Sequence, residues 1–231
     1  MKLIQLAIKY CKKTIVILLI SLMMISTCYS KDISYSLNRE SNNIEETSKE
    51  KQLEEYQISN EVKEKLLKKA KISNWEKFDD IMKEGREFVV IDYYTGYYWA
   101  CVRWMGGNHA DVETVDKEAT ASLRRVNNDR ENWKRRPVLI VFSDGSVYCA
   151  SSFVVDHAGV DGAGFLKEVD NRSRGYGTGM NLDKVTGNDA NGHYCIFVWG
   201  CTNHYNGKPN KEHNANLEFL KNEKERLNKG E

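Results

Sequence analysis

The chain has almost no excess charge of either sign. Its 231 residues carry 34 Lys and Arg against 33 Asp and Glu, which leaves a formal net charge of +1. Proteins that bind nucleic acid usually present a basic face to the phosphates, so this balance argues against a nucleic-acid partner. The sequence also contains no internal repeat, which excludes a repeat array.

Long apolar runs are missing as well, apart from one near the N-terminus. Residues 14–26 carry no charge and follow a lysine-containing start. This run is shorter than the about 20 residues of a membrane span and matches the h-region of an export signal. We therefore expect residues 1–30 to be a signal peptide, with lipidation at Cys28 or an uncleaved anchor as alternatives. All three alternatives predict that the rest of the chain is exported and is extracellular or associated with the cell wall. Only the N-terminal segment would associate with the membrane.

Glycine and tryptophan are both absent from residues 31–73. The polar, charge-rich composition of this stretch is typical of a flexible tether, and apolar residues at helical spacing predict a solvated amphipathic helix over 61–70. All five tryptophans lie in residues 74–231. We expect this part to be a single domain, because roughly 150 residues suit one hydrophobic core.

Alternating apolar segments around turn sequences predict two β-hairpins in the domain. Helical patterns flank them, and a glycine-rich stretch shows no clear secondary structure, which is typical of a lid, a binding loop or disorder. We therefore expect an α+β domain, mostly an antiparallel sheet or sandwich-like arrangement with peripheral helices. The hairpins are expected at 88–104 and 138–153, the helices at 75–82, after a Thr114 cap and at 214–227, and the glycine-rich stretch at 159–192.

Histidine is confined to the last two-thirds of the chain, and one histidine adjoins a cysteine on an expected strand. Residues 194–199 are apolar and bounded by glycines. Strand alternation puts His193, Cys195 and Phe197 on one face and Tyr194 and Ile196 on the other. An imidazole beside a thiol is the local arrangement of a Cys–His nucleophile. Packing, or half of a disulfide, is the alternative for a cysteine on an apolar strand.

An ordered set of motifs is similar to exported domains of Gram-positive bacteria whose activity is unknown. More distantly, His157 followed by His193-Tyr194-Cys195-Ile196 resembles the active-site order of the L,D-transpeptidase family. The resemblance implies a β-sandwich-like fold with Cys195 as nucleophile, His157 as general base and His193 beside the nucleophile. It implies acyl-enzyme transfer or hydrolysis on peptidoglycan stem peptides. The motifs of the first comparison are Gly107–Glu113, Trp133–Val138, Ala150-Ser151, His157–Gly159, Gly192–Ile196, His204 and His213.

Other polar residues of these motifs are candidates for substrate binding. Arg135 or Arg136 could bind a substrate carboxylate in bidentate fashion. His109, Asp111 and His204 complete the expected substrate-binding set, while His213 is expected at the surface. The partner would be peptidoglycan or a cell-wall peptide, and neither a cofactor nor a metal is expected in this interpretation.

Two alternatives stay open, because Tyr194 and Phe197 stand where the transpeptidase motif has Gly and Arg. One is a metal-dependent peptidase or amidase, since the His, Asp and Cys residues supply enough zinc ligands, although no His-x-His pair occurs. The other is a non-enzymatic cell-wall or surface-binding module. Four cysteines follow residue 31 and permit three full pairings, of which Cys101 with Cys149 is the favoured disulfide.

Overall fold

The protein is described here by a computed structural model, which covers residues 56–128 and 132–230. The expected signal peptide and most of the expected tether lie outside these residues. Within the covered ranges, no helix combines the length and the apolar character that crossing a membrane requires.

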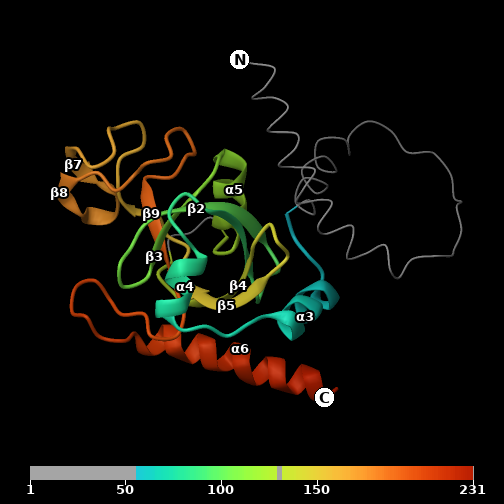
Figure 1. Cartoon of the computed structure of the whole chain (residues 1–231). Coiled ribbons are helices and arrows are strands. Elements are labelled where there is room, and N and C mark those ends of the chain that lie inside the picture. Colours follow the sequence, from blue (N-terminus) through green and yellow to red (C-terminus); the bar gives the residue numbers. More distant parts are fainter. Residues whose placement is uncertain (1–55, 129–131, 231) are drawn as a thin grey trace, which may run out of the picture. The chain divides into compact units, whose positions relative to one another are not determined.

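Six antiparallel strands form a closed barrel (Figure 1). The strand order is β3-β2-β1-β4-β5-β9, and β9 pairs again with β3, which closes the ring. The α+β class, the antiparallel pairing and the peripheral helices are confirmed, but the sheet closes on itself instead of forming two stacked layers. The strands are β1 (Glu87–Asp92), β2 (Tyr98–Met105), β3 (Ala110–Thr114), β4 (Arg136–Val141), β5 (Val147–Ser152) and β9 (Gly192–Phe197).

Both predicted hairpins are present, and a side chain fixes each turn. Between β1 and β2, Asp92 Oδ1 accepts hydrogen bonds from the backbone N–H and the hydroxyl of Thr95. Between β4 and β5, Asp144 Oδ1 accepts the N–H of Ser146 at 2.9 Å. Aspartate side chains that bond two or three residues ahead stabilise tight turns in this way, which is why the local sequence was sufficient to predict them.

The interior of the barrel is packed with apolar side chains from alternate positions of the strands. Cross-strand partners share a face, and Val112 pairs with Tyr194 while Phe88 pairs with Cys101. The Tyr194 hydroxyl accepts a hydrogen bond from Trp99 Nε1 at 2.7 Å and contacts the Cys101 sulfur. Because apolar side chains fill the interior of the barrel, a polar site is expected on its outer face.

Four α-helices surround the barrel in the part of the chain that the structure describes. Each begins with a side-chain cap, from Ser59, Asn74, Asp116 and Asn210. The expected Thr114 cap is wrong, because Thr114 ends β3 and the carboxylate of Asp116 accepts the N–H of Ala119. The helices are α3 (Asn60–Lys69), α4 (Trp75–Ile81), α5 (Lys117–Arg125) and α6 (Lys211–Lys229).

Helix α3 is part of the packed domain. It packs against α6 and β5, Leu66 and Leu67 are buried, and Lys63 Nζ donates to the carbonyl oxygen of Tyr93 at 2.7 Å. The helix that the sequence predicts over 61–70 is therefore present, and its apolar stripe is covered by the barrel and by α6, which runs along one side of the domain (Figure 1).

Short strands and side-chain hydrogen bonds lie within the glycine-rich stretch and just before it. The two-residue strand β6 (His157–Ala158) pairs with β9, and β7 (Glu168–Arg172) pairs with β8 (Gly177–Met180) as a separate two-stranded sheet. The buried Asn181 side chain bonds both the N–H and the carbonyl of Val160. These hydrogen bonds join a side chain to the backbone of a distant residue. They produce no periodic pattern in the sequence, so the sequence did not predict them.

Candidate functional site

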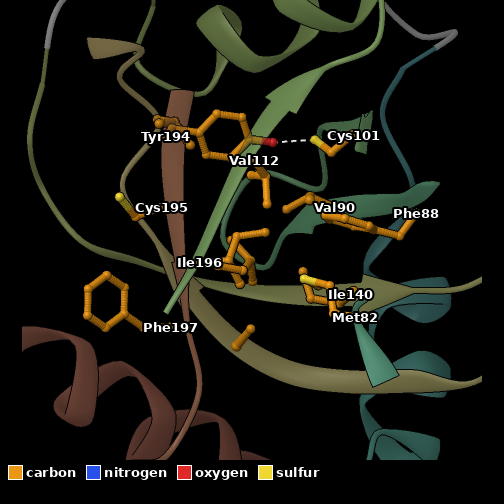
Figure 2. Packing of buried hydrophobic residues seen from close by; sticks show 14 of the residues in the cluster. Met82, Phe88, Val90, Cys101, Val112, Ile140, Tyr194, Cys195, Ile196 and Phe197 are labelled. Carbon is orange, nitrogen blue, oxygen red and sulfur yellow. Dashed lines mark hydrogen bonds between the residues drawn. The ribbon is translucent and has the colours of Figure 1, made fainter. Parts of the chain in front are cut away.

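Strand β9 separates the packed interior of the barrel from a polar cluster on its outer face. Figure 2 shows Tyr194 and Ile196 on one side of the strand, with Cys195 and Phe197 on the other. This is the alternation that the sequence predicts. His193 shares the outer face, since it lies two residues before Cys195 on the same strand.

Strand pairing brings the other polar groups to the same place. Asp111 is the register partner of Cys195 across β3 and β9, and His157 is the register partner of His193 across β6 and β9. Because register partners project to the same face, two neighbouring ladders place these four side chains together.

Asp111 lies at the centre of the cluster. Its Oδ1 is surrounded by four potential metal-ligand atoms, and the two closest histidine contacts are equal in length. Donors around a tetrahedral zinc ion, at about 2.0–2.3 Å from the metal, are separated by roughly 3.3–3.7 Å, so the spacing here is close to that of a coordination shell. The distances from Asp111 Oδ1 are 3.3 Å to His109 Nε2, 3.3 Å to His204 Nε2, 3.5 Å to Cys195 Sγ and 3.8 Å to His193 Nε2.

The charge of this carboxylate is stabilised by its neighbours. Burial acts to raise the pKa of Asp111, but the contacts with His109 and His204 outweigh burial and hold the pKa well below its usual range. In turn, the contact with Asp111 raises the pKa of His204. Asp111 is therefore an anion at neutral pH, and its side chain is only 6% exposed.

His109 is held in an orientation typical of metal-binding histidines. Its Nδ1 lies 2.9 Å from the carbonyl oxygen of Thr202, and since a carbonyl oxygen only accepts, Nδ1 donates there. The Nε2 atom makes no hydrogen bond to any residue that the structure describes, although Asp111 Oδ1 lies 3.3 Å away. Metal-ligating histidines usually donate their other ring N–H to a carbonyl or carboxylate.

The second half of the cluster is fully buried. Ligand atoms of His157, His193 and Cys195 all lie within 4.8 Å of one another. Burial raises the pKa of the Cys195 thiol well above its ordinary value, and the nearby Asp111 carboxylate raises it further. Burial also lowers the pKa of His157 to about 3. The predicted catalytic set is thus brought together, but as a neutral thiol beside a neutral imidazole.

The loop that follows β9 opens one side of the cluster. His204 lies in this loop and its side chain is 50% exposed, whereas the other ligand atoms are covered. Tyr176, from the turn between β7 and β8, is also exposed, and its ring centroid lies 5.3 Å from that of His157. Nothing in the sequence pattern identified Tyr176, because its proximity to His157 arises only from the path of the glycine-rich stretch.

Two more carboxylates hold the glycine-rich stretch beside the cluster, and the sequence did not single them out as structural groups. Glu113 accepts the backbone N–H groups of Lys184 and Val185, and Asp183 accepts that of Gly192 at 2.6 Å. Burial raises the pKa of Glu113 to about 7 and that of Asp183 to about 6. Both are structural anchors for the segment that covers the site.

His213 is buried, which corrects the expectation of a surface position. Its ring stacks on Phe197 with centroids 3.8 Å apart, and His109 stacks on Phe197 at 4.2 Å. Its Nδ1 lies 2.8 Å from the hydroxyl oxygen of Ser151. All five histidines therefore gather near the outer face of β9, and Phe197 separates His213 from the Asp111 cluster.

The two candidate arginines have different environments. Arg136 is buried and makes a bidentate ion pair with Asp92, at 2.6 and 2.8 Å. A guanidinium used in this way cannot bind a substrate carboxylate, so the expected substrate role of Arg136 is wrong. Arg135 is partly exposed; its Nε lies 3.6 Å from Glu212, and its guanidinium lies over the Phe153 ring.

The cysteines that the structure describes are all free thiols, and all are buried. The favoured pairing of Cys101 with Cys149 is therefore wrong. Cys101 points into the barrel toward Tyr194 (Figure 2). Cys149 is the register partner of Leu139, on the opposite face of the sheet, which explains why the two sulfurs do not meet.

Comparison with family models, with curated proteins and with solved structures gives no significant match to this chain. Any functional interpretation therefore depends on the chemistry of the cluster itself.

Proposed function

We propose that this chain is an exported, metal-dependent hydrolase of amide bonds, whose metal ion binds His109, Asp111 and His204. One observation carries the proposal: Asp111 Oδ1 lies 3.3 Å from Nε2 of both histidines, and the ligand atoms of the three residues lie within 4.8 Å of one another. Export is the expectation for residues 1–30. The substrate that fits an exported amide hydrolase with the motifs described above is a cell-wall stem peptide.

The donor set suits a zinc-class ion. Two imidazole nitrogens and one carboxylate oxygen are ligands of catalytic zinc sites, which use three protein ligands and keep one position open. His109 is oriented by the Thr202 carbonyl with its free Nε2 toward Asp111. A divalent cation among these groups would be bound by the imidazole nitrogens and the carboxylate together.

The exposure of His204 gives the site its access. Since half of this side chain is exposed, water and a peptide can approach from the side of the loop after β9. A bound zinc-class ion polarises a carbonyl group and lowers the pKa of a water molecule toward neutrality. Hydrolysis then adds one water across the amide and yields a carboxylate and an amine. Arg135 is the remaining candidate for binding a substrate carboxylate.

A thiol acyltransferase or peptidase is the second candidate function. The proximity of Cys195 to His157 and His193 favours it. However, a nucleophilic cysteine needs a stabilised thiolate, and here both burial and the Asp111 carboxylate raise the pKa of the thiol. The environment of Cys195 therefore supports a metal-binding role better than a nucleophilic one.

The test combines metal analysis with an activity assay on the purified full chain. Metal content is measured by mass spectrometry, and release of products from muropeptides is measured with and without a chelator. We expect activity that is lost on chelation, restored by Zn²⁺ and reduced at least 100-fold in Asp111→Asn and His204→Gln. Tyr205→Phe is the matched control, because Tyr205 follows His204 in the same loop and is 91% exposed.

The outcomes separate the candidate functions. Activity that survives chelation and disappears in Cys195→Ser would replace the metal mechanism with the thiol mechanism. Bound metal with no hydrolysis in any condition would overturn the hydrolase proposal and leave a binding module. A chain that binds no metal at all would remove the basis of the proposal.

A further inference from the structure

A second set of potential metal-binding side chains lies next to the set formed by His109, Asp111 and His204. His157, His193 and Cys195 are all buried, and their ligand atoms lie within 4.8 Å of one another. None of the three belongs to the set formed by His109, Asp111 and His204. The cluster therefore contains twice the number of donors that one three-ligand site uses.

The two imidazoles of this inner set have nitrogens free to bind a metal. His157 Nδ1 lies 3.2 Å from the carbonyl oxygen of Val155, so it donates its proton there and leaves the Nε2 lone pair free. His193 directs its Nε2 toward Asp111 Oδ1 at 3.8 Å. A metal ion offers such nitrogens a partner, because a neutral imidazole binds through one nitrogen and donates from the other.

The residue types of the inner set also suit a transition-metal ion. Neutral imidazole and thiolate are the forms of histidine and cysteine that bind metals. Coordination deprotonates a thiol outright, so the buried Cys195, which is 3% exposed, can bind an ion as a thiolate.

Asp111 connects the inner set to the outer one. Its Oδ1 lies 3.5 Å from Cys195 Sγ and 3.8 Å from His193 Nε2, in addition to its contacts with the outer histidines. Two-metal hydrolytic centres hold their ions about 3.5–4 Å apart. A carboxylate in contact with both ligand sets is placed to bridge ions at such a spacing.

We propose that His157, His193 and Cys195 bind a second divalent transition-metal ion and that Asp111 bridges it to the first. The bridging role rests on the proposed function, whereas the inner ligand set is an independent observation. A thiolate with two imidazoles selects a zinc-class ion over magnesium or calcium, which prefer oxygen ligands. The inner ion is enclosed, and the outer one is accessible through His204.

Metal stoichiometry tests the proposal directly. The full chain is equilibrated with Zn²⁺, freed of loose metal and analysed for zinc per chain. We expect two ions in the wild type and in the Tyr205→Phe control. We expect one ion in His157→Gln and Cys195→Ser, which damage the inner set, and one in His204→Gln, which damages the outer set. Circular dichroism of each variant verifies that it is folded.

Cobalt substitution identifies the inner ion by its absorption spectrum. Co²⁺ bound to a thiolate gives a sulfur-to-metal charge-transfer absorption in the near ultraviolet. We expect this absorption in the wild type and in His204→Gln, and its loss in Cys195→Ser. A wild-type Co²⁺ spectrum without this absorption would overturn the inner site.

The failure of this proposal is distinguishable from the failure of the proposed function. If the wild type binds a single ion that His204→Gln removes and His157→Gln leaves in place, the second site is excluded while the outer site stands. If the wild type binds a single ion and every variant, inner or outer, binds none, the donors form one mixed site and the second ion is again excluded. If the wild type binds no zinc, both proposals are wrong.

Discussion

Asp111 and Cys195 face each other across the β3–β9 ladder, with Oδ1 of the carboxylate 3.5 Å from Sγ. A thiol donates to a carboxylate at this distance, so the two groups stabilise each other only while the sulfur keeps its proton. In the metal sites proposed above, a cation would displace that proton and the same pair would act as ligands. This relationship explains how a Cys–His sequence signal and a His–Asp signal arise from one site.

The thiol of Cys195 is expected to be unreactive in the folded protein. It is 3% exposed, and the reactive thiolate is disfavoured by burial and by Asp111. We expect iodoacetamide to modify Cys195 at neutral pH no faster than the buried Cys149, and to modify both fully in urea. Peptide mass spectrometry over a time course measures this. Selective, rapid labelling of Cys195 would instead support the thiol nucleophile.

Replacing Gly192 with alanine is expected to disrupt the β6–β9 pairing. Gly192 has φ +106, and a Cβ there would lie 2.1 Å from the carbonyl oxygen of His157. We expect Gly192→Ala to lower the unfolding free energy by more than about 3 kcal/mol through strain and lost packing. Gly187→Ala is the control, because Gly187 also has a positive φ of +75 but no atom within 4 Å of an added Cβ. Its cost should be about 1 kcal/mol. Urea denaturation measures the unfolding free energies of both variants. Equal decreases in Gly192→Ala and Gly187→Ala would show that the close contact with the His157 carbonyl does not destabilise the fold.

Breaking the Asp92–Arg136 pair is expected to be strongly destabilising. Asp92 is fully buried, and both of its carboxylate oxygens accept hydrogen bonds from Arg136. Removing one partner of a buried pair costs about 3–5 kcal/mol, so we expect Arg136→Leu to lower the unfolding free energy by this amount. Lys65→Gln, which removes the exposed pair with Glu61, should have little effect on stability, because exposed ion pairs are screened by solvent. A small loss in Arg136→Leu, measured by chemical denaturation, would contradict the structural role of this arginine.

The hydroxyl of Tyr194 is expected to contribute to stability inside the barrel. It accepts the hydrogen bond of Trp99 Nε1 at 2.7 Å, in a fully buried position. Tyr194→Phe leaves that N–H without its partner, which should cost about 1–3 kcal/mol. In a double-mutant cycle with Trp99→Phe, we expect the second substitution to add less than it costs alone. Strict additivity of the two unfolding free energies would exclude the hydrogen bond.

His213 is expected to make the domain less stable in acid. Burial lowers its pKa to about 2, with a further contribution from Arg135, whereas an unfolded histidine has a pKa of about 6.5. Since the unfolded state binds the proton first, the stabilisation is complete above pH 6.5 and falls by about 1.4 kcal/mol per pH unit below it. When the pH falls from 7 to 5, we expect the unfolding free energy of His213→Gln to decrease by about 2 kcal/mol less than that of the wild type. Denaturation curves at both pH values test this, and identical losses would mean that His213 titrates normally.

Local patterns in the sequence were enough to predict the hairpins, the outer face of β9 and most of the helices. The hairpin turns depend on Asp92 and Asp144, which act within three residues, and strand alternation is a property of the chain alone. These features need no information about distant segments, which is why they are confirmed.

The features that depended on distant pairing were missed. Strand β3 is short, and its outward side chains Asp111 and Glu113 made it resemble a loop, so the closure of the barrel could not be foreseen. Arg136 was expected to bind a substrate carboxylate, because its actual partner Asp92 is 44 residues away and no local pattern links the two. His213 lies on a helix whose leucines mark the buried stripe, and a buried histidine on that stripe has no periodic signal of its own.

The pairing of β3 with β9 bears on how the protein folds. Asp111 and Cys195 meet only in the register that the structure has, because a slip of one residue would turn every side chain of β3 to the opposite face. If an ion binds Asp111 and Cys195 as proposed, its presence during refolding should favour correctly closed chains over misaligned ones.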